Sequence, residues 1–229
     1  MDASSDDDLR RCLAELERHG LLLQSDPSLP SITTIVAGEP IRGSWWGHSR
    51  GDEIHRAADA LAHHRDVLLT KLADGKVTYV HRRLWAAVLA VACSRERWQL
   101  DRLPQLAHKM LDSVDQCREL RTDDVPWTGG MKPGEAARHL ERRLLVHSDE
   151  LHTASGAHAK RLERWEKWAE EVGLSTGSMS PDQGKKALHD VVADLNVTFG
   201  GYARLPWAGR RLDAVRATKH KAGRQSDPL

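Results

Sequence analysis

Two aspartates and two histidines recur at helical spacing just after residue 51. They lie three, four and four positions apart, which places them on one side of a helix: Asp52, His55, Asp59 and His63. Carboxylate oxygens and imidazole nitrogens ligate divalent metals, and an Asp/His pair can also exchange protons with a substrate. The spacing is therefore typical of a metal-binding or acid–base face. It is equally typical of the ordinary polar face of a surface helix.

The sequence Trp45-Trp46-Gly47-His48 comes shortly before that helix. An exposed indole ring can stack on a nucleic-acid base, and His48 could donate to a phosphate or act as a general acid or base. The alternative is that Trp45 and Trp46 anchor the loop onto a hydrophobic core, because each ring buries on the order of 200 Å². One ring can pack in this way while its neighbour faces a ligand.

Basic residues outnumber acidic ones in the same stretch. Between residues 42 and 83 there are eight Lys and Arg against five Asp and Glu. Cations at a helix start and at a hairpin tip suit phosphate contacts, which orient a nucleic acid without reading its sequence. The residues expected to make such contacts are Arg50, Arg56, Lys71, Lys76, Arg82 and Arg83. The alternative is a solvated surface crossed by salt bridges, the commonest use of charged stretches.

A helix and a hairpin are expected to position these residues. Ile54, Ala58 and Leu61 recur at helical spacing, which predicts a helix over 53–64. Two β-prone runs follow it around a short loop that contains glycine, and this pattern predicts a hairpin over 67–82.

A helix followed at once by a hairpin resembles the second half of a winged-helix domain. In that fold the helix enters a groove of the nucleic acid and the hairpin forms the wing. A first helix near the N-terminus and a short β-branched strand over 32–36 would supply the missing parts. A nearly wholly apolar run over 84–93 predicts a central buried helix beside this unit.

The second half of the sequence is expected to be helical. Residues 122–133 combine glycines and prolines without any period, which indicates a linker. Apolar residues at helical spacing then predict a helix over 135–152 and a second helix that ends before Gly173, packed as an antiparallel pair. A capping box at Ser180 and Gln183 predicts the start of a further helix.

The whole chain is thus predicted to be mainly α with one β-hairpin, in the α+β class. Residues 1–121 are expected to form a winged-helix-like unit with an added helix, followed by a linker at 122–133. Residues 134–212 are expected to form a small helical bundle, and 213–229 a basic tail with too few apolar residues to fold.

Two further groups of side chains lie in the second half. Four surround the expected turn between the later helices: His147, Glu150, His152 and His158. They could line a polar pocket, although helix capping by nearby Ser and Thr accounts for the same composition. Trp165 and Trp168 lie on an amphipathic helix and could form a contact with a protein partner or a second copy of the chain.

Composition restricts the class of protein without naming a function. The chain has 229 residues, 40% of them hydrophobic and 29% charged, with a formal net charge of +1. It is therefore no general polycation, and any affinity for nucleic acid must come from a local patch. Its three cysteines have no C-x-x-C spacing, the N-terminus is acidic, and no apolar run approaches membrane length. A cytoplasmic protein without a membrane partner is expected.

We expect a nucleic-acid-binding protein, with DNA favoured over RNA, in a regulatory or DNA-processing accessory role. Trp45 or Trp46 would then act as a stacking wedge. One alternative is a hydrolase- or lyase-like enzyme that acts on nucleic acid or a nucleotide through its His/Asp residues, His48, His55, Asp59 and His63. Another is a helical protein–protein interaction module. No cofactor motif is present, and a divalent metal on the His/Asp face is the one cofactor that the spacing allows.

Overall fold

The computed structural model describes residues 3–41, 43–152 and 158–208 of the chain. Helices and strands alternate along the sequence, and the strands belong to two three-stranded antiparallel sheets. The protein is therefore of the α+β class, as the sequence predicts. It has two hairpins, however, where the sequence predicted one.

The first part runs α1 (Ala3–His19), β1 (Leu21–Leu23), α2 (Ile32–Ala37), α3 (Gly51–Ala62), β2 (Val67–Lys71) and β3 (Val77–His81). The last strand lies in the middle of its sheet, because β3 pairs with β1 on one side and with β2 on the other. The predicted helix and hairpin are confirmed here as α3 and β2–β3.

The strand predicted over 32–36 is wrong, because these residues form α2. Ser31 caps this helix: its Oγ accepts a hydrogen bond from the backbone N–H of Thr34 at 3.3 Å. Ile32 and Val36, four positions apart, then share the buried face. The missing strand is β1, which consists of three buried leucines.

The apolar helix α4 (Trp85–Ala92) follows the hairpin, as predicted, and the long helix α9 (Pro181–Phe199) packs along it. Helix α9 begins at the predicted capping box, in which Ser180 and Gln183 each accept the other's backbone N–H. The two helices lie very close together at Gly184, where a Cβ would lie 2.7 Å from the carbonyl oxygen of Ala87. Only glycine allows this contact without a shift of one helix.

The second part runs α5 (Arg97–Leu100), α6 (Gln105–Cys117), β4 (Glu119–Arg121), α7 (Pro133–Glu141), β5 (His147–His152), β6 (His158–Glu163) and α8 (Trp165–Glu171). Its sheet has the order β4-β6-β5, so the last strand again lies in the middle. Because β4 pairs with β6, both sides of the predicted linker contribute to one sheet.

The small helical bundle predicted for 134–212 is wrong, because a hairpin interrupts the helices. Helix α7 ends at Glu141, and Leu144 takes a φ of 53°, which an α-helix does not accommodate. The chain then enters β5, where cross-strand neighbours are complementary: His147 faces Glu163, and Asp149 faces Arg161 of opposite charge. Such pairs stabilise facing positions of a sheet.

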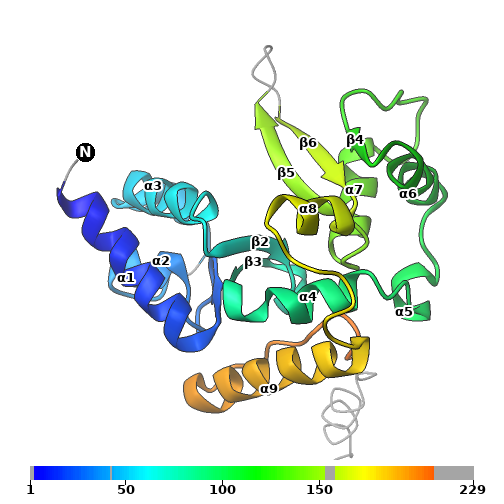
Figure 1. The fold of residues 1–229 in the computed structure, drawn as a ribbon. Coiled ribbons are helices and arrows are strands. Elements are labelled where there is room, and N and C mark those ends of the chain that lie inside the picture. The colour runs from blue at the N-terminus through cyan, green and yellow to red at the C-terminus, as the bar shows by residue number, and fades with distance from the viewer. Residues whose placement is uncertain (1–2, 42, 153–157, 209–229) are drawn as a thin grey trace, which may run out of the picture.

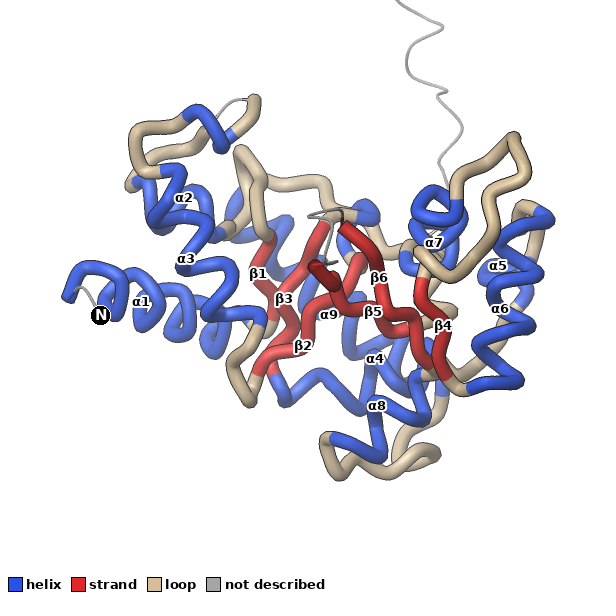
Figure 2. Tube along the Cα trace, turned by 90° about the horizontal axis from the view of Figure 1, so that it is seen from above, coloured by secondary structure: helices blue, strands red, loops and turns tan. Residues whose placement is uncertain are grey.

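Figure 2 shows the two sheets next to each other in the middle of the molecule, with α1 to α3 beyond one sheet and α5 to α7 beyond the other. In Figure 1, α9 runs along one end of the molecule beneath α4. One hydrophobic cluster includes Leu21 and Val80 of the first sheet, Leu144, Trp165 of α8 and Leu188 of α9. The two parts therefore share a common core.

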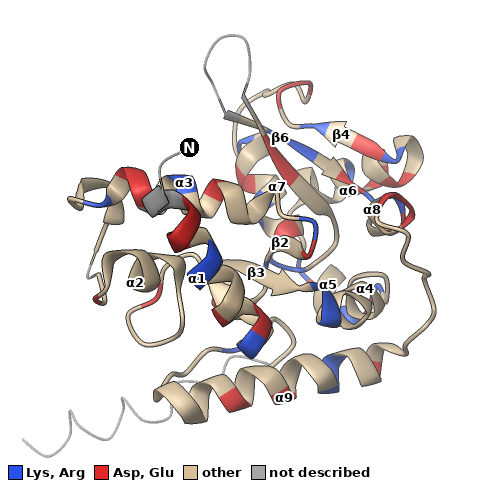
Figure 3. Ribbon diagram, turned by 60° about the vertical axis from the view of Figure 1, so that its left-hand side comes forward, with Lys and Arg blue, Asp and Glu red and all other residues tan. Residues whose placement is uncertain are grey.

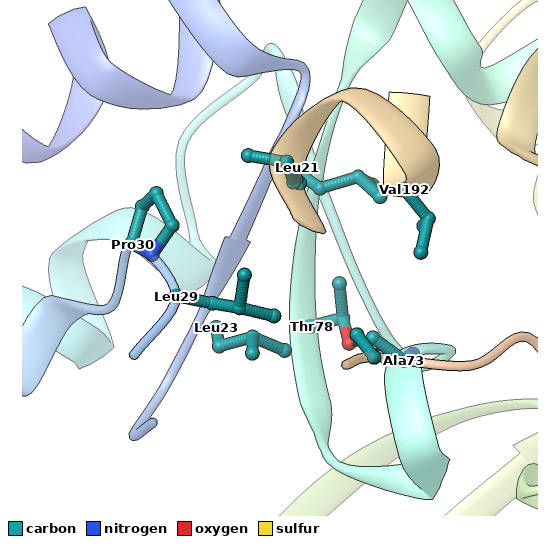
Figure 4. Close-up of a pocket in the computed structure, with 9 residues that line it drawn as sticks. Leu21, Leu23, Leu29, Pro30, Ala73, Thr78 and Val192 are labelled. Carbon is teal, nitrogen blue, oxygen red and sulfur yellow. Dashed lines mark hydrogen bonds between the residues drawn. The ribbon is translucent and has the colours of Figure 1, made fainter. Parts of the chain in front are cut away.

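A small cavity lies in this core between the first sheet and α9 (Figure 4). Its volume is about 10 Å³, and its lining is almost entirely apolar, with Leu21, Leu23, Leu29 and Val192 on its walls. A space of this size corresponds to about one water molecule. It is a packing defect and not a ligand site.

Candidate functional site

The two loop tryptophans divide their roles between core and surface. Trp45 is buried, whereas 67% of Trp46 is exposed, and the two rings stack with their centroids 4.0 Å apart. Their turn is fixed by Gly51, where a Cβ would lie 3.1 Å from the Trp46 carbonyl oxygen. The Nδ1 atom of His48 accepts the backbone N–H of Arg50 at 3.1 Å. One nitrogen of His48 is thus engaged by its own loop.

The predicted His/Asp face lies on α3 and is exposed, as its spacing requires. His63 Nδ1 lies 2.8 Å from the backbone carbonyl oxygen of Asp59 and 3.6 Å from its carboxylate, and both side chains are largely in solvent. Among the described residues, no other element completes a ring of metal ligands around Asp52, His55, Asp59 and His63. The face therefore has the geometry of a polar helix surface.

Three of the six predicted phosphate-binding residues contact buried carboxylates instead. Arg50 reaches Asp8 of α1 at 2.8 Å and also donates to the backbone carbonyl of Val36. Lys71 lies 2.6 Å from Glu141, and Lys76 lies 2.6 Å from Asp26. Each cation thereby holds together segments that are far apart in the sequence.

Two others are at the surface but also have partners. Arg82 pairs with Asp66 at 3.1 Å, and Arg83 donates to the last carbonyls of α1, Glu17 and Arg18. Such contacts satisfy the free carbonyl groups at a helix C-terminus. Of the predicted set, Arg56 alone has no ion pair or side-chain hydrogen bond within the part of the chain that the structure describes. The residues of this set do not converge on one surface site.

Glu141 is the point at which the two sheets are tied together. Its carboxylate accepts from Lys71 of β2 at 2.6 Å, from Ser148 of β5 at 2.7 Å, and from Lys160 of β6. Burial alone would raise the pKa of Glu141, but the two ammonium groups outweigh it and hold the pKa below its ordinary value. The carboxylate is therefore ionised at neutral pH.

A group of potential metal ligands does exist, in the second sheet. Ligand atoms of His147, Asp149 and Glu163 all lie within 4.8 Å of one another, a spacing that could hold a divalent cation. Both carboxylates already have cationic partners, since Lys167 lies 2.5 Å from Glu163 and Arg161 lies 2.6 Å from Asp149. A metal would have to displace these cations.

The structure also shows where the predicted histidines and tryptophans of the second half lie. His147 donates from Nδ1 to Glu163 at 2.9 Å, and its ring packs against Trp165 and Trp168. Both tryptophans are buried. The partner contact predicted for them therefore has no exposed surface in this structure. Glu150 is exposed, and the backbones of His152 and His158 pair at the end of the hairpin.

An exposed set of side chains around the start of α7 was missed in the sequence. Lys132 precedes the helix, Arg138 lies on its exposed face together with one acid, Glu135, and Arg142 follows its last residue. Within the described ranges, no ion pair is formed by any of these four residues. The three cations therefore outnumber the single free carboxylate.

An exposed tryptophan accompanies these cations. Trp127 is 60% exposed, its Nε1 donates to the carbonyl of Gly130 at 3.3 Å, and the Lys132 ammonium lies 5.8 Å from its ring centre. The Gly and Pro content that predicted a linker here builds a loop that holds an aromatic ring at the surface. A tryptophan close to a lysine in a loop of this kind is the sequence feature that could have indicated the site.

The two hairpins differ in how other segments of the chain pack around them. At the tip of β2–β3, the Asp74 N–H donates to the Arg204 carbonyl at 2.8 Å, and a Cβ on Gly75 would lie 3.2 Å from Arg142. This tip is packed between later segments. In Figure 1 the strands β5 and β6 extend upward past α8, beside β4 and the loop that follows it.

Charge is mixed over the molecule as a whole. In Figure 3, acidic and basic positions alternate along α1, and β4 carries both signs.

No helix within the described ranges combines the length and apolar character needed to cross a lipid bilayer. Comparisons with protein-family models, with curated proteins and with solved structures found no match.

Proposed function

We propose that this chain binds nucleic acid, with DNA favoured over RNA, through two winged-helix units in tandem. The order α1-β1-α2-α3-β2-β3 supports the first unit, since a winged helix places a hairpin directly after its groove-binding helix. The order α6-β4-α7-β5-β6 supports the second, in which the loop 122–132 takes the place of a middle helix. Both sheets place their last strand in the centre.

The second unit supplies the contact surface. The outer face of α3 carries Asp52 and Asp59 against Arg56, so it would repel phosphates. The corresponding face of α7 carries Arg138 against one acid, Glu135, with Lys132 at its start, whereas Arg142 follows the helix and packs against Gly75. This excess of unpaired cations on α7 is the observation that carries the proposal.

The packing of the hairpins favours the same unit. A wing contacts the nucleic acid beside the groove that its helix enters, so its tip must be accessible. The β2–β3 tip contacts Arg204 and Arg142, so this hairpin is not free to act as a wing. A binding role is favoured over catalysis because the His and Asp side chains of α3 do not converge with a further element among the described residues.

Fluorescence anisotropy with a labelled duplex at low salt tests the proposal. We expect Arg138→Glu to weaken binding by about tenfold, because it removes a phosphate contact and adds a repulsive charge. The matched control is Arg56→Glu, an exposed Arg on the outer face of α3, which should change the affinity by less than about twofold. Absence of binding by the wild-type protein, or an equal loss in both variants, would contradict the proposal.

A further inference from the structure

We infer that Trp127 stacks on an unpaired base, so that the second unit prefers duplex DNA with an unpaired nucleotide over a fully paired duplex. The inference rests on the proposed nucleic-acid function and adds the class of substrate. It starts from the exposure of this ring and its position relative to α7.

The ring of Trp127 is held in place although it is not buried. Its Nε1 donates to the Gly130 carbonyl within the same loop, and Gly129 and Gly130 take φ values of 102° and 74°. These backbone conformations favour glycine, and they fold the loop back toward the indole. A ring that is already oriented loses little conformational freedom when a ligand binds. Every base offers a flat face to such a ring.

The cations around Trp127 would hold the strand that carries the unpaired base. Lys132 lies 5.8 Å from the ring centre, close enough for its ammonium to contact a phosphate next to a stacked base. Arg138 lies on the outer face of the helix that Lys132 precedes. A groove-binding helix reads bases mainly through its N-terminal residues, and Trp127 lies in the loop that leads into that end of α7.

The two acids of the loop share one cation. Asp123 pairs with Arg121 at 2.8 Å, and Asp124 lies 4.0 Å from the same guanidinium. From the loop to the end of α7, the exposed cations Arg121, Lys132, Arg138 and Arg142 exceed the acids Asp123, Asp124 and Glu135 by one. The loop therefore presents an aromatic ring with a local excess of positive charge, the combination that single-stranded nucleic acid requires.

Trp46 is the natural comparison, because it is exposed to a similar degree. One face of its ring is covered by Trp45 at 4.0 Å, and the ring of His55 lies 5.6 Å away. The adjacent helix face carries Asp52 and Asp59. A stacked base would therefore meet a half-covered ring and a repulsive surface.

The test compares two labelled duplexes that differ by one unpaired adenine. We expect the wild-type protein to bind the bulged duplex about tenfold more tightly, within the range of measured base–aromatic stacking. Trp127→Ala should remove this preference and leave the affinity for the paired duplex unchanged. Trp127→Phe should retain part of the preference. Trp46→Ala, the matched control, should behave like the wild type.

A fluorescent 2-aminopurine at the unpaired position reports stacking directly. Its emission should fall on binding of the wild type and of Trp46→Ala, but not of Trp127→Ala. Equal binding of both duplexes by the wild type, or an equal loss for both duplexes in Trp127→Ala, would overturn the inference while nucleic-acid binding stood. No binding of either duplex would overturn the proposed function itself.

Discussion

The two parts of the molecule share an order of elements but use their charged residues differently. In the first part, Arg50, Lys71 and Lys76 contact carboxylates that are buried in the fold. In the second part, Arg138 remains exposed on α7 without an ion-pair partner among the described residues. A count of cations therefore says little about binding until their partners are known.

The hairpins show the same contrast. The β2–β3 hairpin serves as a packing element, since its tip contacts Arg204 and Arg142 and its Lys71 contacts Glu141. The described strands of the β5–β6 hairpin are held to α7 by Glu141, which accepts from Ser148 and Lys160. The β2–β3 hairpin thus joins the two parts of the molecule.

The largest effect is expected at the joint between the two sheets. Glu141→Ala would leave Lys71 and Lys160 without their carboxylate in a largely buried setting, at a cost of about 3–5 kcal/mol in the free energy of unfolding. Urea unfolding measures this cost. Glu135→Ala, on the exposed face of the same helix, serves as the control and should change stability by less than about 0.5 kcal/mol. Similar values for the two variants would show that Glu141 does not join the sheets.

A smaller, pH-dependent effect is expected within the second sheet. Burial acts to raise the pKa of Glu163, but His147 and Lys167 outweigh it and lower the pKa to about 2 from an ordinary 4.5. Because the folded pKa is the lower one, the stabilisation is complete above pH 4.5 and is lost as the pH falls toward 2.

Glu163→Gln should therefore destabilise the protein by about 2 kcal/mol at pH 6 and by much less at pH 3. Urea unfolding of both proteins at the two pH values measures the difference. A cost that is the same at both values would mean that the ionised carboxylate does not carry the stabilisation.

The smallest effect is expected in the first part, where the loss of a cation paired with a buried carboxylate is compared with the loss of an exposed cation. Arg50→Ala should cost about 1–2 kcal/mol, because buried Asp8 loses one of its two guanidinium partners. Arg82→Ala removes an exposed pair and should cost less than about 0.5 kcal/mol. Thermal unfolding of the two variants tests this order. The reverse order would mean that Arg50 is not a structural residue.

Local sequence patterns predicted some elements well. The α3 helix, the β2–β3 hairpin, the apolar α4 and the capped start of α9 each depend on residues within a few positions of one another. The β5–β6 hairpin could not be predicted in this way, because its strands are rich in charged residues. The reason for their pairing becomes visible only in the structure, where Asp149 faces Arg161. Strand preference depends on such neighbours more than on residue type.

The candidate site was harder to predict for the same reason. The partners of Arg50, Lys76 and Lys71 lie 42, 50 and 70 positions away in the sequence. No local pattern shows that these cations are already paired. Conversely, a loop that contained Gly and Pro was assigned as a linker, although it holds Trp127 at the surface beside α7.

The dependence of DNA affinity on salt tests most directly whether α7 and not α3 contacts the phosphates. Each phosphate contact adds about 0.9 to the slope of log affinity against log salt. Arg138→Ala should therefore lower the magnitude of the wild-type slope by about 1, whereas Arg56→Ala should leave it unchanged. If the magnitude of the slope fell for Arg56→Ala and stayed unchanged for Arg138→Ala, the phosphate contact would lie on α3. That result would contradict a contact on α7.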